Sequence, residues 1–152
     1  MMKIAVVYQS RGGNTKAVAK IIAEEFHVQE ISVDKLNHQP GEVDVLFLGG
    51  GVYEWRMDKS LKTWIEQLDA KKIGQIVCFS TTGYMNSTLK QIREAATKKG
   101  IAVNENELLI KMFLKGHSLL GLQGGNLSDQ QKDEVHQFVD KVKREIKYEQ
   151  IE

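Results

Sequence analysis

A short polar loop between an apolar run and a helical pattern is the first place where this sequence could do chemistry. The apolar run Lys3–Tyr8 is rich in β-branched residues, and the loop after it, residues 10–15, reads SRGGNT. Two glycines allow a sharp turn that brings backbone N–H groups close to a ligand. The N-terminus of the following helix favours an anion. The loop predicts a cradle for a terminal phosphate; the alternative is a tight turn with no ligand.

Two well-known phosphate motifs do not describe this loop. The nucleoside-triphosphate loop GxxxxGK[ST] needs a lysine after its second glycine, and here Gly13 is followed by Asn14. The dinucleotide fingerprint GxGxxG is also absent, because Gly12 and Gly13 are adjacent.

Two further loops carry exposed aromatic residues. Residues 49–56 read GGGVYEWR and residues 81–87 read TTGYMNS. Aromatic side chains on loops can stack on a flat ligand ring, which stabilises binding beyond area burial. The alternatives are that Tyr53 or Trp55 packs onto the next helix, and that the later loop only opens a helix with Asn86 or Ser87 as its N-cap.

The rest of the chain alternates apolar runs with helical patterns, which predicts an α/β protein with a parallel sheet covered on both faces. We expect a single domain over residues 1–152, a three-layer sandwich whose five-stranded sheet has the order 2-1-3-4-5. Gly100 is placed to end the third helix, and Ser128 with Gln131 predicts a capping box for the last. The remaining expected strands are Val28–Val33, Val43–Leu48, Gln75–Ser80 and one within Ala102–Leu114; the expected helices are Asn14–Phe26, Asp58–Leu68, one around Leu89 to Ala96, and one from Ser128 to Ile146, and a short helix within Asp34–Glu42 is left open.

This topology predicts where a ligand would bind. In an open parallel sheet, ligands bind outside the carboxyl ends of the strands, where the strand order reverses. For the order 2-1-3-4-5 that point lies between the first and third strands, so the three loops above should meet there.

Taken together, the three loops resemble those of the flavodoxin family, in its short-chain form. The stretch 10–15 is similar to the family's phosphate loop [ST]-x-T-G-N-T, with Gly12 in place of the usual threonine. Residues 51–55 fall where the family covers the inner face of the isoalloxazine ring, and residues 82–84 fall where it places an outer aromatic. The likeness spans nearly the whole sequence.

The resemblance implies a non-covalently bound FMN and a function in electron transfer with a redox partner protein, either a reductase or an acceptor. Ser10 to Thr15 would hold the phosphate, Tyr53 or Trp55 would lie on one ring face and Tyr84 on the other. No residue is implied as catalytic acid, base or nucleophile. The implied cofactor-binding residues are Ser10, Arg11, Gly12, Gly13, Asn14, Thr15, Gly51, Val52, Tyr53, Glu54, Trp55, Thr81, Thr82, Gly83 and Tyr84.

Two other functions stay open from the sequence. One is an FMN-dependent reductase or dehydrogenase of the quinone or protoporphyrinogen type, with a substrate pocket walled by the glycine-containing stretch Gly116–Gly125. The other is a cofactor-free interaction module of the same topology. A receiver domain would need an acidic cluster after the first strand, where this chain has Gln9-Ser10.

Composition argues against several other classes. The 152 residues carry 21 Lys and Arg against 20 Asp and Glu, so no strong positive charge favours nucleic acid or an anionic membrane. Cys78 is the only cysteine, which rules out an intrachain disulfide. We expect a cytoplasmic monomer without membrane insertion. We expect no metal site, because the four histidines are scattered along the sequence: His27, His38, His117 and His136.

The charges around the predicted cofactor loops depart from the family. Flavodoxins are usually strongly acidic, and acidic loops disfavour the reduced, anionic flavin. Here Arg11, Arg56 and Lys59 stand against Glu54 and Asp58. We therefore predict a flavin that is less strongly reducing than in a typical flavodoxin.

Overall fold

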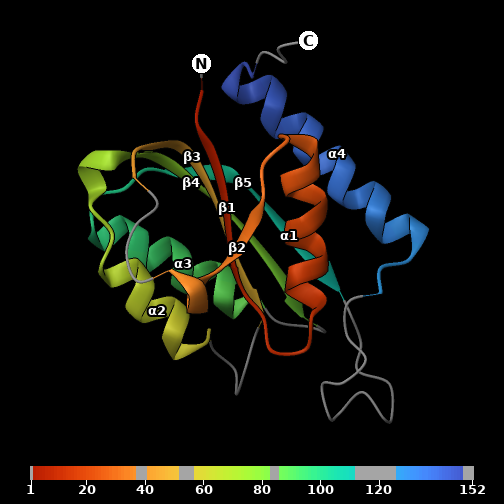
Figure 1. Ribbon diagram of the computed structural model, residues 1–152, viewed down its shortest axis with the longest axis horizontal. Helices are drawn as coiled ribbons and strands as arrows, with labels where there is room; N and C mark the ends of the chain where they lie inside the picture. Colours follow the sequence, from red (N-terminus) through yellow and green to blue (C-terminus); the bar gives the residue numbers. More distant parts are fainter. Residues whose placement is uncertain (1, 37–40, 52–56, 83–85, 112–125, 149–152) are drawn as a thin grey trace.

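The computed structural model of this chain describes residues 2–36, 41–51, 57–82, 86–111 and 126–148. Within these ranges, strands and helices alternate along the chain, as the apolar patterns predicted (Figure 1). The elements are β1 (Ile4–Gln9), α1 (Asn14–Glu25), β2 (Glu30–Ser32), the one-turn 3-10 helix η1 (Val33–Lys35), β3 (Val43–Gly51), α2 (Lys59–Glu66), a second 3-10 turn η2 (Ala70–Lys72), β4 (Ile73–Thr82), α3 (Ser87–Lys98), β5 (Val103–Lys111) and α4 (Asp129–Ile146).

The strands form one five-stranded sheet in the order β2-β1-β3-β4-β5, and every neighbouring pair is parallel. Helices α1 and α4 cover one face of the sheet, while α2 and α3 cover the other (Figure 1). The α/β class, the three layers and the strand order are therefore confirmed.

Two apolar layers hold the sandwich together, because successive residues of the inner strands point to opposite faces of the sheet. On β3, Phe47 points toward α1 and α4, whereas Leu46 and Leu48 point toward α2 and α3. Trp64 and Cys78 are buried in the second layer. Burial of apolar surface in both layers is the main force that fixes the four helices on the sheet.

The structure corrects two predicted loop boundaries. Strand β3 does not end at Leu48 but continues through Gly49–Gly51: Gly49 and Gly50 pair with both β1 and β4, and Gly51 pairs with β4. Strand β4 likewise includes Thr81 and Thr82, which pair with β5. Glycine and threonine are common in loops, which is why the sequence predicted loops here. The strands on either side offer hydrogen-bond partners to the backbone N–H and C=O groups of these residues, so the strand pairing continues.

Local signals marked the helix ends well. Ser128 and Gln131 form the predicted capping box at the start of α4. Gly100 follows α3 with a φ of +78°, a left-handed conformation that favours glycine. Asn86 is the N-cap of α3, although its side chain makes no capping hydrogen bond. In the described part of the stretch where a short helix was left open, the structure has the 3-10 turn η1, and residues 37–40 lie outside the described residues.

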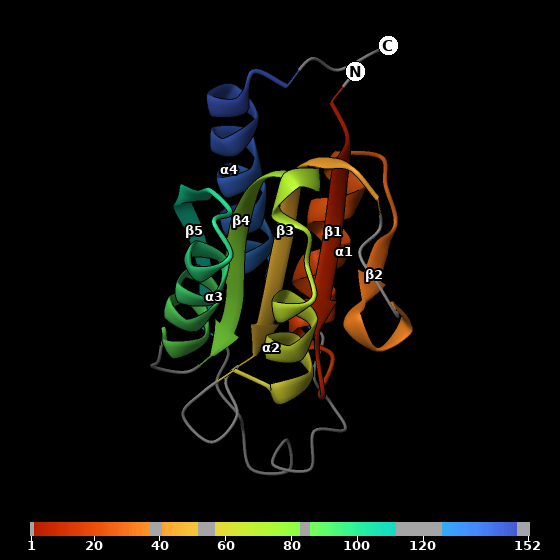
Figure 2. The ribbon, with the colours of Figure 1, turned by 90° about the vertical axis from the view of Figure 1, so that its left-hand side faces the viewer.

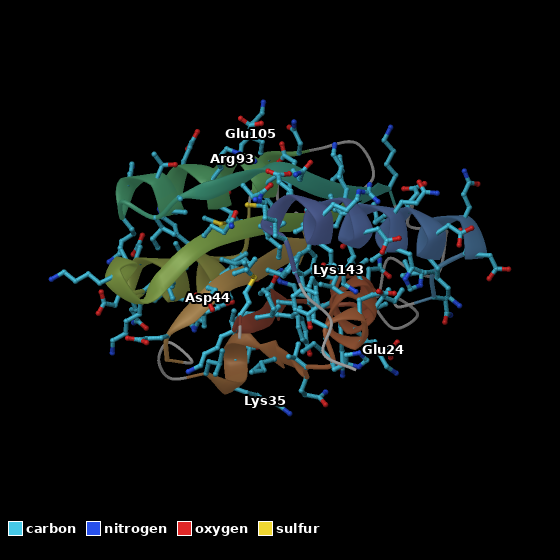
Figure 3. All side chains as sticks on the ribbon, turned by 90° about the horizontal axis from the view of Figure 1, so that it is seen from above. Glu24, Lys35, Asp44, Arg93, Glu105 and Lys143 are labelled. Carbon is cyan, nitrogen blue, oxygen red and sulfur yellow. The ribbon has the colours of Figure 1, made fainter. Side chains whose placement is uncertain are left out.

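A charged cluster joins the C-terminal end of α1 to α4. Lys143 of α4, labelled in Figure 3, donates to the backbone oxygen of Glu25 at 2.9 Å and to its carboxylate at 3.1 Å. His136 contacts the other carboxylate oxygen of Glu25 at 2.7 Å. Burial raises the pKa of Glu25, but the hydrogen bonds from Lys143 and His136 outweigh it and hold that pKa below its ordinary value.

The two edges of the sheet are short or polar. Strand β2 has three residues, all partly exposed. Strand β5 has four consecutive polar residues, Asn104–Glu107, in its first half and carries a register shift against β4. At that irregularity, the side chain of Asn104 donates to Gln75 of β4 at 2.8 Å.

The packing of β3 against β4 generates a stability prediction. A Cβ atom at Gly49 would lie 2.3 Å from the buried ring of Phe79. Gly49→Ala should therefore lower the free energy of unfolding by about 1–3 kcal/mol, the usual cost of overpacking, measured by the urea midpoint. In a Phe79→Leu background, which makes room for the methyl group, Gly49→Ala should cost clearly less. Strictly additive effects of the two substitutions would contradict the steric cause.

Candidate functional site

The predicted ligand-binding edge lies at the carboxyl ends of β1, β3 and β4. The strand order reverses between β1 and β3, because β2 lies on one side of β1 and β3 on the other. The N-terminus of α1, the end of β3 and the end of β4 meet at this edge, at the bottom of Figure 2. Position in the fold alone marks it as the default binding site.

The first loop forms a turn closed by its own serine. The Gly13 N–H donates to the Ser10 hydroxyl at 3.0 Å, and the Gly13 carbonyl accepts the first helical hydrogen bond, from Ala17, also at 3.0 Å. Gly13 is the N-cap residue of α1 and has a φ of +93°. A side chain would be strained in that conformation, so glycine is required by the backbone.

This geometry leaves the start of α1 suited to an anion. The first backbone N–H groups of a helix have no partner within the helix, and Gly13 has no side chain with which to cap them. The first turn also contains no acidic residue that could occupy the anion position. The turn and the helix N-terminus together fit a phosphate group.

A buried hydrogen bond fastens this loop to β4. The hydroxyls of Thr15 and Thr81 lie 2.7 Å apart, and both residues are almost fully buried. The bond joins the first turn of α1 to the end of β4, two of the three predicted site segments. Thr15 and Thr81 therefore fix the two segments against each other, and the hydroxyl that accepts in this bond keeps its own hydrogen to donate.

A second polar contact fastens the loop to α2. The Arg11 guanidinium donates to one carboxylate oxygen of Asp58, from Nε at 2.9 Å and from Nη2 at 2.6 Å. The other oxygen of Asp58 caps α2 by accepting from the Ser60 N–H at 2.8 Å and from its hydroxyl at 2.7 Å. Arg11 therefore carries a charge that is balanced locally, a fact that the sequence did not reveal.

Four hydrogen bonds set the charge of Asp58. Burial raises the pKa of the Asp58 carboxyl. The hydrogen bonds from Ser60 and Arg11 lower it by more than burial raises it, so the pKa falls below the ordinary 3.8. Asp58 is thus ionised at neutral pH and stabilises both the α2 terminus and the position of Arg11.

Side chains from α3 and β4 hold the start and the end of the second loop. The Ser80 hydroxyl donates to the Gly50 carbonyl at 2.6 Å, and the Thr88 hydroxyl donates to the Gly51 carbonyl at 2.7 Å. At the far end of the loop, the Met57 N–H donates to the Gln91 side chain at 2.7 Å. Both anchors of residues 52–56 are therefore fixed by hydrogen bonds.

The structure places part of the predicted site and leaves the rest outside the described residues. Ser10, Arg11, Gly12, Gly13, Asn14, Thr15, Gly51, Thr81 and Thr82 all lie at the carboxyl edge of the sheet. Outside the described residues lie Val52, Tyr53, Glu54, Trp55, Gly83 and Tyr84, together with Arg56 and the Gly116–Gly125 stretch of the alternative reductase function.

Sequence reasoning missed several residues that organise this edge. Thr88 and Gln91 anchor the second loop from α3. Gln9, at the end of β1, is 4% exposed, and its side-chain oxygen has no hydrogen-bond partner among the described residues. Gln9 could have been found from the sequence, because it is a polar residue at the end of an apolar strand. The anchoring role of Thr88 could not, because it depends on where β3 ends.

The described ranges contain no cluster of three or more histidine, cysteine or acidic side chains that could bind a metal ion. Cys78 is fully buried, and burial raises the pKa of its thiol to about 12, so the thiol stays protonated. Within the same ranges, no helix combines the length and the apolar character needed to cross a bilayer.

Comparison with known proteins agrees with this architecture. The family model described as "Flavodoxin domain" matches residues 5–150. An uncharacterized protein of Methanocaldococcus jannaschii is 28% identical over 126 residues, which cover 80% of each chain.

Two solved structures share the fold. A flavodoxin from the domain Archaea superposes with a TM-score of 0.68 at 22% identity, covering 97% of this chain and all of the other. A Fusobacterium nucleatum flavodoxin variant bound to flavin mononucleotide superposes with a TM-score of 0.67 at 12% identity, covering 95% and 98% of the two chains.

The Asp58 contacts predict a pH dependence of stability. Because its pKa is lower in the folded chain than in the unfolded one, Asp58 stabilises the fold above its ordinary pKa, and this contribution is lost as the pH falls through the folded value. Asp58→Asn should therefore lose less stability than the wild type between about pH 6 and about pH 3, measured by urea unfolding. Asp140→Asn, at an exposed position of α4, is the control and should keep the wild-type difference. An unchanged pH dependence in Asp58→Asn would contradict the assignment.

Proposed function

This chain belongs to the flavodoxin family, and from that premise we propose that it is an electron carrier that binds FMN and exchanges electrons with redox partner proteins. FMN is the cofactor of the family, and when bound it supplies the redox chemistry. The observation that carries the proposal is the anion-binding turn at the N-terminus of α1, which lies at the topological switch point and is built around the left-handed Gly13.

The described residues divide into two groups by their proposed role. Backbone N–H groups of the turn and of the first turn of α1 hold the phosphate, together with the hydroxyl hydrogen of Ser10, whose oxygen accepts from Gly13. Thr15, Thr81, Arg11 and Asp58 act behind the site by fixing the turn against β4 and α2. Stacking of Tyr53 or Trp55 on one ring face and of Tyr84 on the other remains a proposal from the family pattern.

The flavin environment also depends on which charges are balanced. The contact with Asp58 leaves Arg11 as half of an ion pair, so its effect on a nearby flavin is weaker than that of an isolated charge. The proposal of a less strongly reducing flavin therefore rests mainly on Lys59 and Arg56 against Glu54.

Binding of the phosphate is tested by comparing two glycines with the same backbone constraint. Gly13 and Gly100 both have positive φ, of 93° and 78°, so alanine should strain either backbone by about 1–2 kcal/mol. Gly13→Ala should raise the FMN dissociation constant at least about tenfold, because about 1.4 kcal/mol of strain or lost contact is enough for that factor. The measurement is quenching of flavin fluorescence on addition of apoprotein.

Two controls give this result its meaning. Gly100 lies just after the C-terminal end of α3, away from the binding edge at the N-terminus of that helix. The Gly100→Ala variant should therefore bind FMN like the wild type. Riboflavin, which lacks the phosphate, should bind the wild type more weakly than FMN and lose less affinity than FMN in Gly13→Ala. Wild-type FMN affinity in Gly13→Ala, or equal losses in both variants, would contradict a phosphate site at the α1 turn.

A turnover assay separates the carrier from the reductase alternative. The FMN-loaded protein, mixed with NADH or NADPH and a small quinone, should oxidise the nicotinamide no faster than the same concentration of free FMN. Saturable turnover well above that background, followed by nicotinamide absorbance, would instead show an FMN-dependent reductase.

A further inference from the structure

A groove is lined by residues of α2 and α3 and the segments next to them. These two helices cover the face of the sheet opposite α1 and α4 (Figure 2). The groove has a volume of about 450 Å³, and its apolar lining includes Met57 and Ala95. Among the described residues, Lys59, Lys62, Lys98 and Lys99 rim it against two carboxylates, those of Glu66 and Glu94. The balance of formal charges around the groove is therefore positive.

The helix periodicity explains why these residues share one surface. On α2, Lys59 and Lys62 are three residues apart, and on α3, Glu94 and Lys98 are four apart. Residues with these spacings lie on the same face of a helix. Each helix thus presents one stripe to the groove, and the lysine stems add apolar surface while their ammonium groups stay in water.

Most of the positive charge is uncommitted within the described residues. Lys99 donates to the Glu66 backbone oxygen at 2.9 Å and closes the groove at the C-terminal ends of the two helices. The ion pairs found among the described residues involve none of Lys59, Lys62 and Lys98, and all three are exposed. Exposed, unpaired cations around an apolar floor are suited to an acidic protein partner.

The groove adjoins the candidate cofactor site. Met57, which lines the groove, follows directly on residues 52–56 and is held by Gln91, which lines it too. Lys59 follows Asp58, the residue that binds Arg11 of the phosphate turn. One end of a partner seated in the groove would therefore lie beside the carboxyl edge of the sheet, where the electrons would have to pass.

We propose that the groove between α2 and α3 docks an acidic segment of a redox partner protein, with partner carboxylates meeting Lys59, Lys62 and Lys98. That the partner is a redox protein rests on the proposed function, whereas the preference for acidic protein rests on the groove itself. A nucleic acid suits the groove less well, because a sugar–phosphate backbone has no apolar side chains to pack on Met57 and Ala95, whereas a protein segment can carry them beside its carboxylates.

The docking surface is tested by titrating ¹⁵N-labelled, FMN-loaded protein with a decaglutamate peptide at low salt. Saturable shifts should appear at backbone amides of α2 and α3 and weaken as salt is added. The double charge reversal Lys62→Glu with Lys98→Glu should raise the apparent dissociation constant at least about tenfold. Its matched control is Lys132→Glu with Lys141→Glu on α4, which changes the net charge equally and should alter the affinity less than about twofold.

A kinetic measurement links docking to electron transfer. A reduced, acidic [2Fe–2S] ferredoxin gives up one electron from its cluster, and the flavin accepts it. At low salt, the Lys62→Glu, Lys98→Glu variant should accept this electron at least about fivefold more slowly than the α4 control, with an unchanged flavin content.

The outcomes separate this proposal from the function on which it rests. Equal losses in the two double variants, shifts confined to other elements, or equally tight binding of a ten-nucleotide thymidine strand would overturn the acidic-protein groove. A protein that takes up no FMN would overturn the proposed function, and the peptide titration would still be readable on the protein as purified.

Discussion

The hydrogen bond between Thr15 and Thr81 couples the two halves of the binding edge. It joins the first turn of α1, which follows β1, to the last residues of β4, and β3 lies between these two strands in the sheet. Both hydroxyls are buried, so loss of either one would leave an unpaired polar group in the interior, which costs more than the net value of the bond itself. Together with the contacts of Ser80 and Thr88 to the last carbonyls of β3, it makes the carboxyl ends of three strands one hydrogen-bonded unit.

Much of the fold could be predicted from local patterns, whereas the contacts at the site could not. The inner strands and all four helices follow from runs such as Val43–Leu48 and from the helical spacing of apolar residues. The extension of β3 through Gly49–Gly51 escaped, because glycine reads as a turn residue and only the pairing with β1 and β4 shows otherwise. Thr15 and Thr81 are 66 positions apart, so their contact requires the register of the sheet.

Charge was the property that sequence described least well. Residues 10–59 offered a list of positive and negative side chains, and their sum suggested a basic environment for the cofactor. The structure shows that Arg11 forms an ion pair with Asp58, which is also the N-cap residue of α2. Lys59, Lys62 and Lys98, which take part in none of the ion pairs among the described residues, lie instead along α2 and α3, outside the turn proposed to hold the phosphate. That distribution suits the attraction of an acidic partner more than the tuning of a bound ring.

The edges of the sheet have a consequence for how this protein behaves at high abundance. An exposed edge strand can act as a template on which a second copy adds its own strand, the first step toward aggregation. Here one edge, β2, offers only three residues, and the other, β5, combines charged side chains with an irregular register. Growth of the sheet from one copy to the next is therefore disfavoured on both sides, and the helix faces and the carboxyl edge are left as the surfaces through which the protein meets other molecules.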